Sequence, residues 1–99
     1  MADQVLGAGS NALVLVRLPR ALVDLFPGSE TEVRLAAASV AELLDVLEVR
    51  WPGIRDRLCD SSPRIRQHLN IFVDGVRANL ETPLPSGATV HILTAMSGG

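Results

Sequence analysis

Apolar positions alternate with polar ones in several short stretches of the chain and recur at helical spacing in one. The run ALVLVRL (12–18) is rich in Val and Leu and is followed by Pro19, so it predicts a strand inside a sheet, with both faces at least partly covered. Residues 31–36 alternate between apolar and polar side chains, which predicts a second strand. Pro27-Gly28 is a turn signal between the two strands, so we expect them to form a hairpin.

The helical pattern begins at Ser39. Glu42 follows three positions later, which is the spacing of a capping box: we expect the Ser39 hydroxyl to accept from the backbone N–H of Glu42, and the Glu42 carboxylate to accept from the N–H of Ser39. Pro52-Gly53 is expected to end the helix. The apolar stripe of this helix consists of Val40, Leu43, Leu44, Leu47 and Trp51.

Two more strands are predicted in the second half of the chain, at 68–73 before the turn signal Asp74-Gly75 and at 88–95. We expect residues 52–67 to be a mostly irregular insertion, with a short helical turn from Ile54 to Cys59. The order strand, strand, helix, strand, strand indicates an α+β fold in which one helix covers one face of the sheet. The right-handed crossover rule allows the first and last strands to be parallel neighbours.

Composition removes several classes of function. A chain of 99 residues forms one domain and has little interior for an enclosed active site, so an enzyme acting alone is disfavoured and we predict no catalytic residue. A net charge of -2 with 3% aromatic residues argues against nucleic-acid binding. The apolar runs are too short for a membrane span, and no secretory signal pattern is present. A single cysteine excludes an internal disulfide, so we expect a cytoplasmic protein.

Other reactive side chains give weak signals. Cys59 is expected to be a small buried hydrophobic residue, and His68 and His91 lack the spacing of metal ligands, so no metal site is predicted. Asp56 and Asp60 suggest no catalytic pair, because no pocket is evident around them. Two interpretations of the nearby arginines stay open, a solvated face or an electrostatic contact with a partner; these arginines are Arg55, Arg57, Arg64 and Arg66.

Four landmarks accompany this order of elements: Pro52-Gly53 after the helix, Asn70-Ile71-Phe72-Val73 before a turn, Leu84-Pro85-Ser86-Gly87 before the last strand, and Gly98-Gly99 after it. With them the chain resembles the ThiS/MoaD family of sulfur carriers over residues 12–99. The resemblance implies the ubiquitin-like β-grasp fold, a mixed sheet of about four to five strands with one main helix on one face. The segment GIRDRLCDSSP (53–63) is most similar to CysO-type carriers.

The resemblance also implies a division of the chain and a chemistry. Residues 1–11 would be a flexible leader, 12–95 the β-grasp domain and 96–99 a flexible tail. An ATP-dependent adenylyltransferase, similar to ubiquitin-activating enzymes, would adenylate the Gly99 carboxylate, and sulfur would then displace AMP to leave a thiocarboxylate. The chain would be a protein cosubstrate with no cofactor of its own, since the partner uses the ATP. The residues expected to thread into the partner are Met96, Ser97 and Gly98.

Several acceptors are compatible with such a carrier. One is a cysteine synthase type of enzyme, with a metalloprotease releasing the product; another is a thiazole-synthase-like enzyme of cofactor or natural-product biosynthesis. Alternatively, the chain would be the small subunit of molybdopterin synthase. A different class of function is a ubiquitin-like interaction module or protein modifier. In each case we expect a monomer when the chain is free, with no nucleic acid and no membrane as partner.

Alternation in the strands also defines a face for partners. If the buried face consists of Val14, Val16, Leu69, Ile71, Val73, Val90 and Ile92, the opposite face carries a different set. Its apolar members predict a contiguous patch for docking the activating enzyme and the acceptor, although a scatter of apolar side chains without function would look the same. The residues of this face are Leu15, Arg17, Phe72, His91 and Leu93.

All nine basic residues are arginine, and the chain contains no lysine. Two explanations stay open. One is codon bias in a GC-rich genome. The other is that lysine amines are avoided because they would attack an activated acyl group at Gly99.

Overall fold

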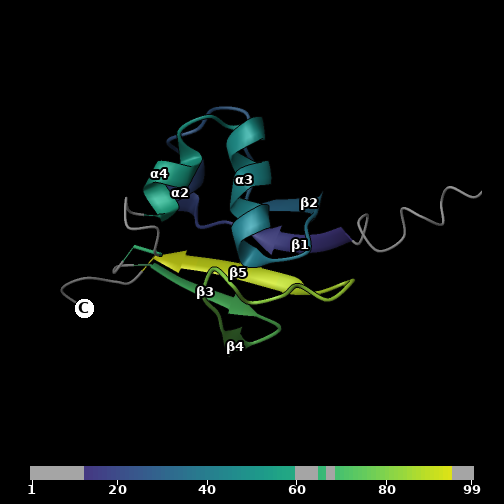
Figure 1. Ribbon diagram of the computed structural model, residues 1–99. Coiled ribbons are helices and arrows are strands. Elements are labelled where there is room, and N and C mark those ends of the chain that lie inside the picture. Colours follow the sequence, from purple (N-terminus) through teal and green to yellow (C-terminus); the bar gives the residue numbers. More distant parts are fainter. Residues whose placement is uncertain (1–12, 60–64, 67–68, 95–99) are drawn as a thin grey trace, which may run out of the picture.

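Five strands form one mixed sheet, and all helices lie on one side of it (Figure 1). The structure is a computed structural model that describes residues 13–59, 65–66 and 69–94. The strand order is β2-β1-β5-β3-β4. The α+β class and a sheet of four to five strands are therefore confirmed. The strands are β1 (Leu13–Arg17), β2 (Glu32–Ala36), β3 (Leu69–Val73), β4 (Val76–Arg77) and β5 (Thr89–Thr94).

The central strand of the sheet is β5. It pairs in parallel with β1, from Leu15 opposite Thr89 to Arg17 opposite His91, and antiparallel with β3. β1 therefore lies inside the sheet, as predicted, and its antiparallel pairing with β2 confirms the predicted hairpin. Because β1 and β5 are parallel, the chain enters β1 at the end of the sheet opposite to the one where it leaves β5.

The main helix is α3 (Val40–Arg50), and its stripe of Val40, Leu43, Leu44 and Leu47 is buried. Ser39 Oγ accepts from the N–H of Glu42 at 3.2 Å, as predicted. The second half of the predicted capping box is wrong by one residue, because the Glu42 carboxylate accepts from the N–H of Ala38 at 2.6 Å. Ser39 forms an isolated bridge with Pro83 that uses the Ala38 carbonyl and the Val40 N–H. The bridge leaves the Ala38 N–H to the carboxylate.

A short helix, α2 (Arg20–Val23), interrupts the connection between β1 and β2 and was not predicted. The N–H groups of Leu22 and Val23 bond back to the Pro19 carbonyl, and the Leu22 side chain is buried. Leu22 and Phe26 are four residues apart, which is a helical spacing, but four residues are too few to stand out as a periodic pattern. The predicted turn at Gly28 is present, with a φ of 91°.

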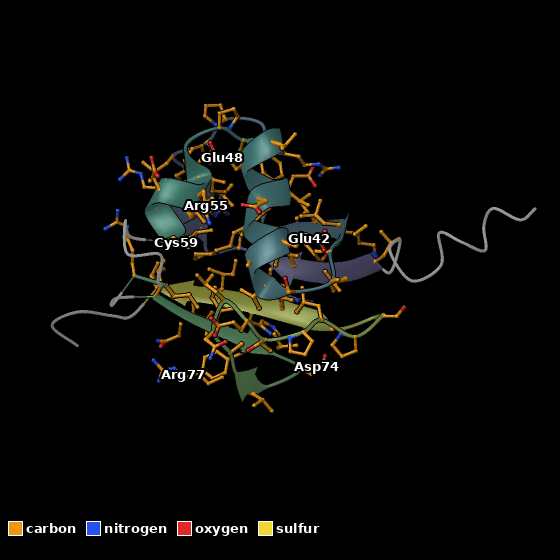
Figure 2. The ribbon with its side chains drawn as sticks, viewed as in Figure 1. Glu42, Glu48, Arg55, Cys59, Asp74 and Arg77 are labelled. Atoms are coloured by element: carbon orange, nitrogen blue, oxygen red, sulfur yellow. The ribbon has the colours of Figure 1, made fainter. Side chains whose placement is uncertain are left out.

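The insertion after α3 is more regular than predicted, because it contains α4 (Ile54–Leu58) and contributes to the core. Ile54, Leu58 and Cys59 are buried, so the prediction of a mostly irregular segment was wrong over its first half. The burial of Cys59 as a small hydrophobic residue is confirmed (Figure 2). α3 packs against α4, so the insertion extends the helical layer above the sheet.

A tight turn at Asp74-Gly75 joins β3 to β4, as its sequence predicted. Asp74 has a φ of 50° and Gly75 a φ of 87°, a pair of left-handed conformations that suits a two-residue hairpin loop. The Asp74 side chain also accepts from the N–H of Thr89 at 2.9 Å, which fastens the turn to β5. β4 itself was not predicted, because two residues cannot show alternation.

The core lies between the sheet and α3. All seven side chains assigned to the helix-facing side of the sheet are buried, from 0% exposed for Val16 to 7% for Val73. Within the described residues no polar or charged side chain is buried. None of the helices in that part of the chain is long and apolar enough to cross a membrane.

Candidate functional site

The sheet face that points away from the helices carries one residue from every strand in a single row. Arg17 lies opposite Glu32 on one side and His91 on the other, and Phe72 lies between His91 and Arg77. Four of the five side chains come from different predicted or newly found strands, and register alone brings them together. The row, in strand order, is Glu32, Arg17, His91, Phe72 and Arg77.

Alternation placed all five predicted face residues on the correct side. Phe72, His91 and Leu15 are half-buried, Arg17 is exposed, and Leu93 is 46% exposed. These positions confirm the geometry on which the docking prediction depends. The docking role itself stays a prediction.

The face is less apolar than the predicted patch. Arg17 forms an ion pair with Glu32 at 3.0 Å, and both side chains are about half exposed. Together with His91, Arg17 separates Leu15 from the other apolar side chains. Phe72 lies opposite His91, and Leu93 is two residues further along β5, so these two are diagonal neighbours. We call Phe72 and Leu93 the apolar pair.

Arg77 is the member of the row that sequence reasoning missed. It is exposed on β4 and makes no ion pair within the described ranges (Figure 2). A signal was available, because a two-residue turn at Asp74-Gly75 forces the following residues to run back along β3. Counting across that turn places Arg77 opposite Phe72.

The predicted carrier tail begins where β5 ends. Gly99 and the threading residues Met96, Ser97 and Gly98 lie outside the described residues, so their roles stay predictions. The root of the tail is Thr94, the last residue of the central strand. β5 is hydrogen-bonded to neighbours on both sides, so this root is firmly held.

Thr94 also lines a small hollow on the helical side of the sheet. The hollow has a volume of about 150 Å³ and lies between α2, α4 and the ends of β3 and β5. Leu25, at its edge, is 51% exposed. We call this feature the root hollow; its lining is Ala21, Leu22, Leu25, Arg57, Leu69 and Thr94.

The arginines near α4 have different surroundings. Arg55 pairs with Asp45 at 3.0 Å, and Arg66 Nε donates to the backbone carbonyl of Asp56 at 2.7 Å. Both therefore stabilise the local fold. Arg57 is exposed and makes no hydrogen bond or ion pair with any described residue. Arg64 and Asp60, which belonged to the predicted cluster, lie outside the described residues.

Glu48 is the titratable group most affected by the fold. Its carboxylate accepts from the N–H groups of Gly53 and Arg55, each at 2.9 Å (Figure 2). These two backbone hydrogen bonds, with a smaller effect from the Arg55 guanidinium, hold the pKa of Glu48 below its ordinary value. The carboxylate satisfies the first N–H groups of α4, which is a structural role.

No metal centre is evident in the described ranges: they contain no group of three or more His, Cys, Asp or Glu side chains placed to hold an ion. His91 lies in the cross-strand row between Arg17 and Phe72. His68 lies outside the described residues.

Residues 16–99 match the family model described as the ThiS family. The chain belongs to the ThiS family. A chain of the crystal structure of the Amycolatopsis orientalis BexX/CysO complex is 31% identical, with a TM-score of 0.78; the match covers 87% of this chain and 99% of that one. CysO of Mycobacterium tuberculosis is 27% identical, with a TM-score of 0.75, over 84% of this chain and 99% of its own.

A relative of a different description is also similar. The solution structure of small archaeal modifier protein 1 from Methanosarcina acetivorans is 26% identical, with a TM-score of 0.73, over 92% of this chain and 100% of that one. No curated protein sequence matches the chain significantly. The fold is therefore a ubiquitin-like β-grasp, and this ThiS-family member is of the CysO type in its structural similarity. The family consists of small ubiquitin-like carrier proteins.

Proposed function

We propose that the chain is a sulfur carrier in which Gly99 is the terminal residue and holds sulfur as a thiocarboxylate. The observation that carries the proposal is the match to the ThiS family, which extends through residue 99 and includes both glycines of the tail. The similarity to two CysO structures supports the same proposal.

A carboxylate must be activated before sulfur can replace its oxygen, because the negative charge shared by both oxygens makes its carbon a poor electrophile. In the proposed first step a Gly99 oxygen attacks the α-phosphorus of ATP, and pyrophosphate leaves. In the second step hydrosulfide attacks the Gly99 carbonyl carbon; a C–S bond forms, the C–O bond to phosphate breaks, and AMP leaves. An adenylyltransferase partner would supply the groups that promote both steps.

The chain would supply a carried group on a narrow, extended support. Residues 95–99 span at most about 17 Å when extended, which is enough to leave the domain and enter a partner. Gly98 has no Cβ, so it passes through a channel that excludes other residues. Met96 and Ser97 would line the same channel. Because Thr94 ends the central strand, a partner that grips the sheet also fixes the origin of the tail.

We propose the exposed sheet face as the docking surface for this partner, through Leu15, Arg17, Phe72, His91 and Leu93. The apolar pair would provide most of the binding energy, because large side chains at the centre of an interface usually do. Leu93 precedes the root of the tail by one residue. Docking there would direct the tail into the partner.

For the acceptor we propose an enzyme of the cysteine synthase type, with a metalloprotease releasing the product, or a thiazole-synthase-like enzyme. The similarity to CysO supports the first, and CysO of Amycolatopsis orientalis forms a complex with BexX. The small subunit of molybdopterin synthase is a further alternative within the family. ATP would be used by the activating partner, with no cofactor held by this chain. This requirement for ATP suits action in the cytoplasm, where we propose that the free chain is a monomer.

A second candidate function is protein modification, in which Gly99 forms an amide with an amine of a target. The similarity to small archaeal modifier protein 1 favours this candidate. The two functions share adenylation and differ in the nucleophile that follows.

Adenylation is tested by exchange of labelled pyrophosphate into ATP. The activating enzyme is incubated with ATP, labelled pyrophosphate and the chain, beside a variant lacking Gly99. We expect exchange that depends on the chain and is lost with the variant. Exchange supported equally by both proteins would contradict the role of Gly99.

A further inference from the structure

The basic residues of the chain provide charge without a primary amine. All nine are arginine in a chain of 99 residues. A guanidinium has a pKa above about 12 and shares its charge over three nitrogens, so it is not a nucleophile at neutral pH. A lysine amine has a pKa of about 10.4, so a small fraction is always free to attack an activated carbonyl.

One of these arginines lies at the root of the tail. Arg57 and Thr94 line the same root hollow, so residue 57 is a neighbour of the point where residues 95–99 leave the domain. Arg55 and Arg66 are occupied by Asp45 and by the Asp56 carbonyl. Arg57 is exposed and is engaged by no described residue. Of the α4 arginines described, it is therefore the one left to act on the tail.

A positive charge suits this position. The tail would carry a carboxylate before activation and a phosphate diester once adenylated, and a guanidinium binds both kinds of anion. An ammonium group would do the same, but its free-amine form would be close to the activated carbon. The requirement for charge and the danger of an amine therefore conflict at residue 57.

We propose that Arg57 is the residue that keeps the base of the tail cationic while denying the activated Gly99 an internal nucleophile. The proposal rests on the proposed carrier function. With lysine at this position, the amine nitrogen would attack the Gly99 carbonyl carbon; a C–N bond would form, the bond to AMP would break, and the amine proton would pass to solvent. The product would be an internal isopeptide that can no longer accept sulfur.

The geometry also separates the tail from other amines. The chain enters β1 beside the first residue of β5, because these strands are parallel. An α-amino group ahead of β1 is therefore attached at the far end of the sheet. Arg34 lies near that end, opposite Leu15, which in turn lies opposite Thr89. Five residues along β5 and two strand spacings put it about 20 Å from Thr94.

The test needs no partner enzyme. An intein fusion cleaved with mercaptoethanesulfonate gives the full chain with a thioester at Gly99, which stands in for the acyl adenylate. Thioesters of the wild type, Arg57→Lys and the matched control Arg34→Lys are incubated at pH 8, and intact mass distinguishes hydrolysis from loss of the thiol with amide formation. Resistance to hydroxylamine and fragment masses then locate the amide.

We expect the wild type to hydrolyse only, and Arg57→Lys to form the internal amide at least about tenfold faster than Arg34→Lys, because the tail reaches the control position only when almost fully extended. Equal rates for the two variants, or hydrolysis alone for both, would overturn the proposal. So would internal amide formation by the wild type at the rate of Arg57→Lys. Circular dichroism of each variant establishes that it is folded. The carrier function is judged separately, by adenylation of the wild type, so failure of either claim is recognised independently.

Discussion

Single carboxylates organise the helical layer of this molecule. Glu48, near the end of α3, accepts from two N–H groups at the start of α4, so one side chain joins the two helices. Each of these hydrogen bonds favours the ionised carboxylate, which lowers its pKa. The junction is therefore sensitive to acid.

Glu48→Gln tests this junction. The pKa of Glu48 is lower in the folded than in the unfolded state, so its contribution to stability is complete above the unfolded pKa of about 4.3 and is lost as pH falls through the folded pKa. We expect Glu48→Gln to lower the melting temperature at pH 7, and the difference from the wild type to shrink as pH falls below about 4. Thermal unfolding followed by circular dichroism measures both.

Glu30→Gln is the matched control, because Glu30 is exposed and forms no hydrogen bond with the described residues. It should melt at the wild-type temperature at either pH. A Glu48→Gln difference that is the same at pH 7 and pH 3 would exclude the charge as its cause.

At the scale of residues, alternation predicted which side chains face outward but not how they combine. Phe72 and His91 were assigned to the correct face because their neighbours are strongly apolar. The ion pair between Arg17 and Glu32 depends on the register between β1 and β2, which the sequence does not state. The expected patch was for that reason drawn too apolar.

Among the elements, α3 was the most predictable and the short ones the least. Eleven residues with a buried stripe and a capping serine carry a strong pattern. α2 has four residues and β4 has two, so tertiary packing determines them more than local pattern. The reach of Glu42 to Ala38 likewise follows from the pairing of Ser39 with Pro83, a contact between distant segments.

Ser39→Ala tests the start of α3. The variant loses the hydroxyl that accepts from the Glu42 N–H, and we expect the free energy of unfolding to fall by about 1 kcal/mol. Urea denaturation at neutral pH measures the change. Ser39→Asp keeps an acceptor at the same position and should lose clearly less; an equal loss in both variants would show that the cap bond is not the cause.

For the whole molecule, the sheet has two sides with different tasks. The helices cover one side and bury the core, and the other presents a row of mixed charge beside the apolar pair (Figure 1). The fold class could be predicted from the order of elements, and the docking face from alternation. The root hollow could not, because it is formed by the unpredicted α2, by α4 and by two strand ends.

Phe72→Ala tests the docking surface. We expect the KM of the activating enzyme for this chain to rise about tenfold with kcat little changed, because Phe72 would contact the partner and not the reacting atoms. Val49→Ala is the matched control, since Val49 is 82% exposed but belongs to α3 on the opposite side. An unchanged KM for Phe72→Ala, or an equal rise for both variants, would contradict docking through this face.

The central claim is that Gly99 carries sulfur, and intact mass tests it most directly. The chain is incubated with ATP, its activating enzyme and sulfide, beside the variant lacking Gly99 and a reaction without ATP. The account predicts a mass increase equal to the replacement of one oxygen by sulfur, located in the fragment that contains Gly99 and absent from both controls. An unchanged mass, under conditions in which the same enzyme adenylates the chain, would contradict the carrier function; an amide between Gly99 and a target protein would establish the modifier in its place.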